Sequence, residues 1–221
     1  MTRYRGLWRL VVTVTAVLVG LGGTAAASPL WSDPNAMPAW RGTQNFYVEG
    51  TGFFTGATID VDVEYAVYQP GDYEGSGIDP SGGTEYVYAY QVFNDRAGNR
   101  AVANFSVGLD PTANVANIGS DAGSGTTPGG TAPTASAFSG TPPTSAVWYF
   151  FLNTIDPPPA NEYSKVLLFT SPYGPQWAPA TVMNGGLGNT QDMPSPIPEP
   201  ATLAFLALGG VGLLARRRCG K

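Results

Sequence analysis

Residues 28–195 contain no segment with the apolar spacing of an amphipathic helix, and this restricts the chain to β folds. Residues 57–68 instead place Ile59, Val61, Val63 and Tyr65 on one face and acidic side chains on the other. That alternation is the period-two pattern of a half-buried strand. Glycine and proline, 29 and 20 in number, divide the rest into short segments. We expect an all-β domain, a single antiparallel β-sandwich of Ig-like or jelly-roll-like type.

Two further pairs of segments have strand character. Residues 84–93 are rich in tyrosine and valine, and residues 100–109 follow after a turn, so we expect a hairpin. We expect a second pair, 145–155 with 162–170, around the prolines at 157–159. The centres of the second pair are apolar at nearly every position, which predicts central strands covered on both faces. A weaker strand is expected over residues 45–54.

A segment of different composition separates the two pairs. Residues 119–144 are rich in glycine, serine, threonine, alanine and proline and are nearly free of charge. This composition favours a long flexible loop, and an interdomain linker is the alternative. We therefore expect one β-sandwich domain over residues 28–195 with this loop inside it.

The first 27 residues predict a secretory signal peptide. Three arginines precede an apolar run over residues 10–21, and Ala25 and Ala27 then stand at the positions of an A-x-A-like cleavage site. We expect signal peptidase to cut after Ala27. An N-terminal anchor that is never cleaved is the alternative.

The last 26 residues, 196–221, combine three features in order. These are Pro198, Glu199 and Pro200, then an apolar run over 201–215, then the basic residues Arg216, Arg217 and Arg218. As a helix the apolar run would span about 22 Å, which is short for the roughly 30 Å of bilayer hydrocarbon. The basic cluster is expected to stay cytoplasmic. We expect a hydrophobic helix that anchors the chain transiently, with Glu199 held in an accessible, extended segment.

This arrangement resembles the PEP-CTERM sorting signal of bacterial envelope proteins, and residues 198–203, PEPATL, follow its pattern closely. The resemblance implies that an exosortase, a membrane-embedded protease with a catalytic cysteine, recognises the motif. It also implies cleavage near the motif and delivery to the cell surface or its polysaccharide matrix. A plain C-terminal anchor is the alternative. The resemblance covers about 26 of 221 residues, so the role of the body stays open.

Loss of both signals changes the chemistry of the chain. Residues 28–197 contain fifteen acidic and four basic residues, a net charge of −11, against −5 for the whole sequence. Such a surface repels phosphate groups, so we expect no nucleic-acid partner. The chain has no histidine, and its single cysteine, Cys219, lies in the tail. Histidine-dependent catalytic triads, histidine-ligated metals and disulfides within the body are therefore excluded.

Two groups of acids are candidate Ca²⁺ sites. Asp60, Asp62 and Glu64 project from one strand face about 7 Å apart, but a solvated face explains them without a metal. The second group lies in a glycine-rich loop and consists of Asp72, Glu74 and Asp79. Carboxylates and backbone carbonyls in such a loop could surround a Ca²⁺ ion. Ordinary turn chemistry is the alternative.

Aromatic residues supply the last candidate site. Tyr86, Tyr88 and Tyr90 share a strand face, and Trp148 and Trp177 could complete a platform for sugar rings. Aromatic side chains in strands are more often core, where each buries about 150 to 250 Å². A pair of carboxylates for glycoside hydrolysis needs a cleft, and fifteen acids single out no particular pair.

Together these features lead to one functional expectation and two alternatives. We expect an exported, non-enzymatic structural or binding protein that an exosortase sorts to the envelope or the extracellular polysaccharide. It needs no cofactor, and it contacts the membrane before processing. The first alternative is a Ca²⁺-dependent carbohydrate-binding or adhesive module. The second is a glycoside hydrolase that uses two of the carboxylates.

Overall fold

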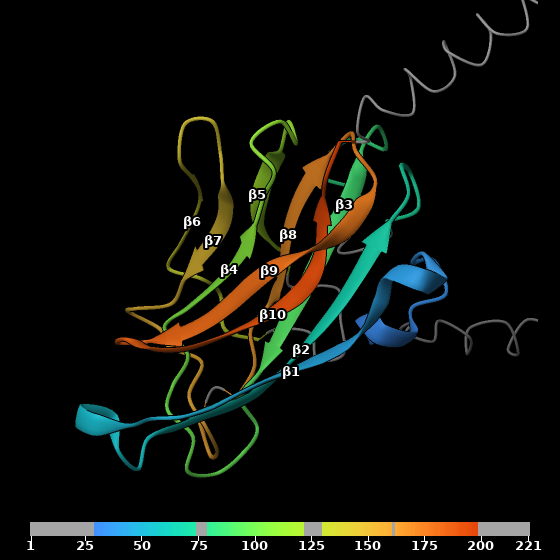
Figure 1. Ribbon diagram of the computed structural model, residues 1–221. Coiled ribbons are helices and arrows are strands. Elements are labelled where there is room, and N and C mark those ends of the chain that lie inside the picture. Colours follow the sequence, from blue (N-terminus) through green and yellow to red (C-terminus); the bar gives the residue numbers. More distant parts are fainter. Residues whose placement is uncertain (1–28, 74–78, 122–129, 161, 199–221) are drawn as a thin grey trace, which may run out of the picture.

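The computed structural model describes residues 29–73, 79–121, 130–160 and 162–198 (Figure 1). Within these ranges the chain forms ten strands in two antiparallel sheets, three short 3-10 helices and no α-helix. This confirms the expected all-β architecture. The expected signal helix and the hydrophobic helix over 201–215 lie outside the described residues. No helix within the described ranges has the length and hydropathy needed to span a membrane.

Each sheet has five strands. The first has the order β1-β2-β3-β8-β5 and the second the order β10-β9-β4-β7-β6. In the first sheet these are β1 (Arg41–Glu49), β2 (Thr58–Tyr68), β3 (Tyr86–Phe93), β8 (Val166–Ser171) and β5 (Ala116–Asp121). In the second they are β10 (Leu187–Pro196), β9 (Pro175–Asn184), β4 (Asn104–Gly108), β7 (Ser145–Tyr149) and β6 (Ala135–Ser139).

The strand pairing corrects both expected hairpins. β3 pairs with β2 and β8, whereas β4 pairs with β7 and β9 in the other sheet. β7 and β8 likewise lie in different sheets. Each of these connections crosses the sandwich, so both strands point their apolar side chains into a shared core from opposite sides. A hairpin would produce the same alternation, and the pattern therefore could not separate the two arrangements.

The expected loop over 119–144 is wrong where strands form within it. β5 extends to Asp121, and residues 135–139 form β6. The small, polar residues there have little intrinsic preference for strands. Main-chain pairing of β5 with β8, and of β6 with β7, holds them in place instead.

The expected weak strand over 45–54 corresponds to β1, which begins earlier and ends at Glu49. The sequence pattern does not predict β9 and β10, because prolines argue against strands. Pro194 and Pro196 are tolerated because β10 is an edge strand. Pro179 lies just beyond the last pair between β4 and β9, which joins Val107 to Ala180.

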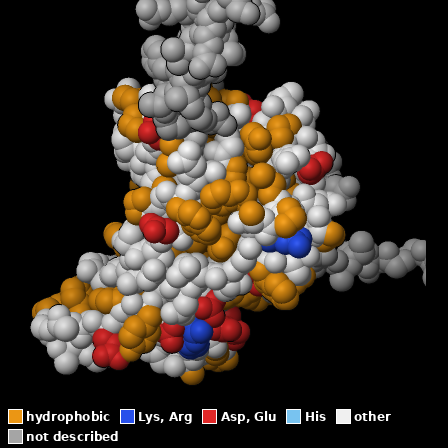
Figure 2. All heavy atoms as spheres, turned by 45° about the vertical axis from the view of Figure 1, so that its right-hand side comes forward, with side chains coloured by type: hydrophobic (Ala, Val, Ile, Leu, Met, Phe, Trp, Pro, Cys, Tyr) orange, Lys and Arg blue, Asp and Glu red, His pale blue; other side chains and the backbone are white. Residues whose placement is uncertain are grey.

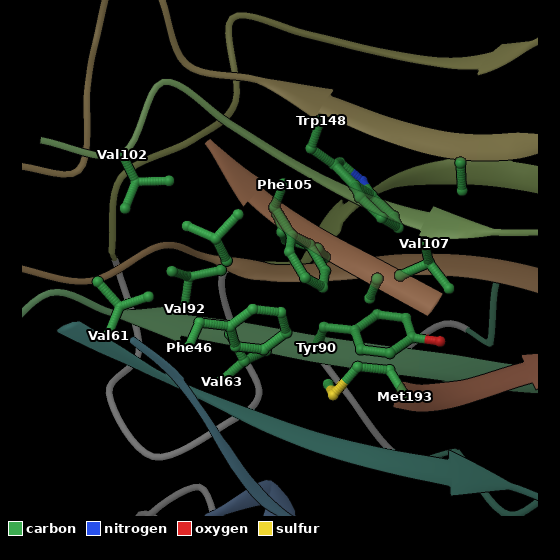
Figure 3. Close-up of a cluster of buried hydrophobic side chains, with 14 of the residues drawn as sticks. Phe46, Val61, Val63, Tyr90, Val92, Val102, Phe105, Val107, Trp148 and Met193 are labelled. Carbon is green, nitrogen blue, oxygen red and sulfur yellow. The ribbon is translucent and has the colours of Figure 1, made fainter. Parts of the chain in front are cut away.

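The main core lies between the two sheets (Figure 3). Phe46 of β1 and Phe105 of β4 meet edge to face with ring centroids 6.4 Å apart. Tyr90 of β3 lies 6.0 Å from Trp148 of β7. Met193 of β10 is fully buried in the same cluster. The aromatic residues at the centre of the strands are therefore core, as favoured from the sequence.

A third layer covers the outer face of the first sheet. It consists of residues 29–40, which include η1 (Leu30–Ser32) and η2 (Pro38–Trp40), and of the segment that follows β2. Leu30, Ala36 and Tyr73 pack there against β2, β3 and β8. This second cover explains why β8 is buried at all six positions, which confirms one expected central strand.

The other expected central strand is shorter than its apolar run. β7 is buried at Ala146, Val147 and Trp148, whereas Phe151 and Leu152 are exposed beyond its end. Residues 29–40, which cover the first sheet, do not extend over this end of the second sheet.

Candidate functional site: an aromatic cluster beside an open pocket

The acids of β2 make structural contacts. Arg96 donates to Asp60 Oδ1 at 2.6 Å and to Asp62 Oδ2 at 2.9 Å. Glu64 is buried under the third layer, where its Oε2 accepts the backbone N–H of Leu30 at 3.2 Å. Within the described part of the chain, no three acids come together in a group that could hold a metal.

The glycine-rich loop after β2 holds two of the three acids expected to bind Ca²⁺. Asp72 is exposed. Asp79 turns back on Ser81, whose backbone N–H and hydroxyl donate to Asp79 Oδ1 at 2.7 and 2.6 Å. Glu74 lies outside the described residues. The Ca²⁺ site formed by Asp72, Glu74 and Asp79 therefore stays a prediction.

The expected aromatic platform is divided by the fold. Tyr88, Tyr90 and Trp148 are buried, and burial raises the pKa of both tyrosines. Tyr86 is partly buried. Trp177, in contrast, is 49% exposed. One member of the predicted set is thus available at the surface.

Trp177 belongs to a different group, the aromatic cluster of Trp40, Tyr65 and Trp177. The Trp177 ring lies 5.2 Å from the Trp40 ring and 5.9 Å from the Tyr65 ring, between centroids. The three side chains come from η2, β2 and β9. Sequence reasoning placed Tyr65 on the apolar face of its strand but gave no signal for Trp40.

Local features set the positions of these rings. Pro38 begins η2, and the backbone N–H of Met37 donates to the Val67 carbonyl at 2.8 Å, which ties the segment to β2. Gly42 of β1 lies directly opposite Tyr65. A Cβ at Gly42 would approach Tyr65 Oη to 2.7 Å, so glycine allows the phenol to lie across β1.

An open pocket of about 330 Å³ lies beside Trp40. Its described lining consists of Pro34, Asn35, Ala36, Met37, Pro38, Ala39, Trp40, Gln69 and Asp72. Asn35, Gln69 and Asp72 are exposed polar groups, and Ala36 is buried. The pocket therefore combines an aromatic wall with two amides and a carboxylate. Hydrophobic side chains gather across the middle of the face shown in Figure 2, with acidic and basic side chains near its lower end.

The backbone around the pocket is held by short-range hydrogen bonds. The Asn35 N–H donates to Asp33 Oδ1 at 2.9 Å, and the Asp72 N–H donates to the Gln69 carbonyl at 3.0 Å. Both contacts use the backbone of the pocket residue, so the Asn35 amide and the Asp72 carboxylate do not serve these turns.

A second open pocket, of about 340 Å³, lies beside Asp110, Val115 and Pro142. Its carboxylate is used within a turn, because the Thr112 N–H and hydroxyl donate to Asp110 Oδ1 at 2.8 and 2.5 Å. These hydrogen bonds lower the pKa of Asp110. The described lining has no aromatic residue, and this pocket is the weaker candidate for a sugar ring.

The expected sorting motif follows the last strand directly. β10 ends at Pro196, and the Ile197 N–H donates to the Gly174 carbonyl at 3.4 Å. Pro198 is the last described residue, so Glu199, Pro200 and the three arginines at 216–218 lie outside the described residues. The same is true of Ala25 and Ala27.

The comparisons with known proteins concern this end of the chain. Residues 196–218 match a family model described as the PEP-CTERM protein-sorting motif. No curated protein and no solved structure matches the chain. The match confirms the expected sorting signal and indicates an exported protein that an exosortase sorts. It begins on the final residue of β10.

Proposed function

We propose that the body is a non-enzymatic polysaccharide-binding protein of the cell envelope or the extracellular matrix. The observation that carries this proposal is the pocket beside Trp40, whose lining combines this aromatic side chain with Asn35, Gln69 and Asp72. Binding pockets of this kind combine apolar walls with a few polar groups that set orientation.

The chemistry of the pocket suits a sugar. The faces of a pyranose ring carry C–H groups that can lie on the indole of Trp40, whose ring offers a large, rigid contact area. The hydroxyl groups of the sugar can then donate to the Asp72 carboxylate and exchange hydrogen bonds with the Asn35 and Gln69 amides. Trp177 packs against Trp40, and Tyr65 packs against Trp177 in turn.

The described lining supports binding without hydrolysis. Glycoside hydrolases use two carboxyl groups about 5 to 9.5 Å apart. Among the described residues that line the pocket, Asp72 is the single acid. A hydrolase would release new reducing ends from a polysaccharide that the protein binds, so a reducing-sugar assay tests this alternative.

A glycan array tests the binding proposal. We expect Asp72→Asn and Asn35→Ala to weaken binding of the recognised glycan about tenfold each, because the first replaces a charged hydrogen-bond acceptor with a neutral one and the second removes the amide. Both side chains are exposed, so the fold should be unchanged. Asp192→Asn, the same chemical change at an exposed position of β10, is the matched control and should bind as the wild type does. No binding to any glycan, or equal binding by all variants, would contradict the proposal.

The same array tests for calcium. If Asp72, Glu74 and Asp79 hold a Ca²⁺ ion that orders the loop, a chelator should abolish binding. Binding that persists in chelator would exclude the Ca²⁺-dependent form of this function.

We also propose the processing that accompanies sorting. Signal peptidase removes residues 1–27, the apolar run over 201–215 holds the precursor in the membrane, and exosortase then cuts near Glu199. Fractionation of cells that make the wild type or Glu199→Ala, with mass measurement of the mature C-terminus, tests this order. We expect loss of the tail in the wild type and retention in Glu199→Ala. An intact tail in the wild-type product would contradict processing.

A further inference from the structure

The connection between β8 and β9, together with the first three residues of β9, forms an uncharged, aromatic surface. This exit segment, residues 172–177, exposes Tyr173 at 36% and Trp177 at 49%. The chain contains no charged residue between Lys165 and Asp192. Exposed aromatic side chains without neighbouring charges in the same segment are a feature of surfaces that meet an apolar or interfacial partner.

The exit segment borders the point where the chain leaves the body. Pro196 pairs with Pro175, and Pro194 pairs with Trp177, in the ladder between β10 and β9. The Ile197 N–H donates to the carbonyl of Gly174, between the two exposed aromatic residues. The tail therefore departs from the exit segment itself.

The length of the remaining chain limits how far the exit segment can lie from the apolar run. Pro198 and Ala201 are three residues apart, and an extended chain covers at most about 11 Å over that span. The headgroup layer on each side of a bilayer is about 5 to 8 Å thick. An apolar run inserted from Ala201 therefore brings the exit segment to within reach of the headgroups.

We propose that the exit segment rests in the lipid headgroup region before exosortase acts, with Tyr173 and Trp177 as its interfacial side chains. Tryptophan and tyrosine prefer this region because their rings have an apolar body and a polar edge. The inference rests on the proposed membrane insertion of the tail. It adds that the body is oriented on the membrane and that the Pro198-Glu199-Pro200 motif is held at a fixed height above the hydrocarbon.

The test uses the full chain in phosphatidylcholine vesicles that contain lipids brominated near the headgroup, because bromine quenches nearby tryptophan emission. We expect Trp177→Phe to lower the quenched part of the emission roughly twofold, because an interfacial ring is lost. The difference in quenched emission between the wild type and Trp177→Phe removes the contribution of the other tryptophans. Phe53→Trp is the control: Phe53 is 97% exposed in the turn that joins β1 to β2. This turn lies at the opposite end of the molecule from the end of β10 (Figure 1), so it should add emission without quenching.

A second variant tests the role of chain length. A flexible Gly-Ser spacer between Ile197 and Pro198 should abolish the Trp177-dependent quenching while the chain still floats with the vesicles. Equal quenching in the wild type and Trp177→Phe, in chains that float, would overturn the inference and leave the sorting proposal intact. Chains that do not float would contradict membrane insertion itself. Loss of glycan binding in Trp177→Phe without a change in quenching would assign the residue to the sugar site and also overturn the inference.

Discussion

The hydroxyl groups of three buried tyrosines connect separate parts of the fold. The acceptors are Asp33 Oδ2 for Tyr68, the Tyr173 carbonyl for Tyr88 and the Pro194 carbonyl for Tyr90. Burial is the largest cause that raises the pKa of all three phenols above the usual value. Each hydroxyl therefore stays protonated in the folded protein at a pH at which a solvated tyrosine ionises.

This difference predicts alkaline destabilisation. Unfolded tyrosine has a pKa of about 10, so at lower pH both states keep the proton and the free energy of unfolding is unaffected by these groups. Above about pH 10 the unfolded chain loses the protons first, and stability falls as pH rises. Denaturant unfolding at a series of alkaline pH values measures this loss. Tyrosinate absorbance from all eleven tyrosines near pH 10, in a protein that stays folded, would contradict it.

The ion pairs on β2 give a second prediction at this scale. Arg96 contacts Asp60 and Asp62, and Asn45 Nδ2 donates to both carboxylates at 2.9 Å. The groups are partly exposed, so screening limits the effect. We expect Arg96→Ala to lower the free energy of unfolding by about 1 kcal/mol, and by less in high salt. Urea unfolding at two salt concentrations measures the change. An unchanged loss in high salt would argue against an ionic origin. In a double-mutant cycle, the effects of Arg96→Ala and Asp60→Asn on the free energy of unfolding should not be additive, because the two side chains interact. Additive effects would contradict the ion pair.

The sequence pattern predicts the acidic face of β2 but not Arg96, the residue that pairs with it. The alternation of Ile59, Asp60, Val61 and Asp62 shows that these carboxylates leave the core side of the strand. Arg96 lies in the turn after β3, and only the antiparallel pairing of β2 with β3 brings it beside them. The sequence pattern shows on which face of its strand a side chain lies. Which residue it contacts on the next strand depends on the strand register.

At the scale of elements, β4 contributes the centre of the core. Phe105 contacts Phe46, Tyr90 and Trp148 at ring distances of 5.6 to 6.4 Å. We expect Phe105→Ala to lower the free energy of unfolding by about 3 to 5 kcal/mol, because it leaves a cavity that the rings cannot fill. Denaturant unfolding measures the loss. Phe53→Ala is the matched control, since this ring is 97% exposed, and its effect should stay within about 0.5 kcal/mol.

The elements that the sequence predicts are those with a regular side-chain pattern. β2, β3 and β8 carry enough β-branched and aromatic residues to be recognised. β6 and β10 do not, because their residues are small or include proline, and main-chain pairing with a sequence neighbour, β7 or β9, holds each of them in place. The candidate pocket was equally hidden: Trp40 stands in a short 3-10 helix, and its position beside Gln69 and Asp72 depends on how residues 29–40 cover the first sheet.

For the molecule as a whole, the boundary between body and tail gives the next prediction. β10 buries Leu187, Met193 and Ser195 and pairs with β9 along its full length. A chain that ends at Pro198 should therefore unfold cooperatively, like the chain that retains the tail. A chain that ends at Gly186 should fail to fold, because the core loses Met193 and one side of β9 loses its partner. Circular dichroism and thermal unfolding distinguish these cases, and a stable fold without β10 would contradict the boundary.

The position of β10 also has a consequence in time. A chain is synthesised from its N-terminus, so the strand that completes the second sheet and delivers Met193 to the core is the last one to become available. β10 also packs against β1 and β2, which lie far from it in the sequence, and contacts between such distant segments are slow to form. The sandwich can close only when nearly all of the polypeptide has emerged, and the sorting signal is the next segment in line. Closure of the sandwich and recognition of the sorting signal therefore follow one another at the same end of the molecule.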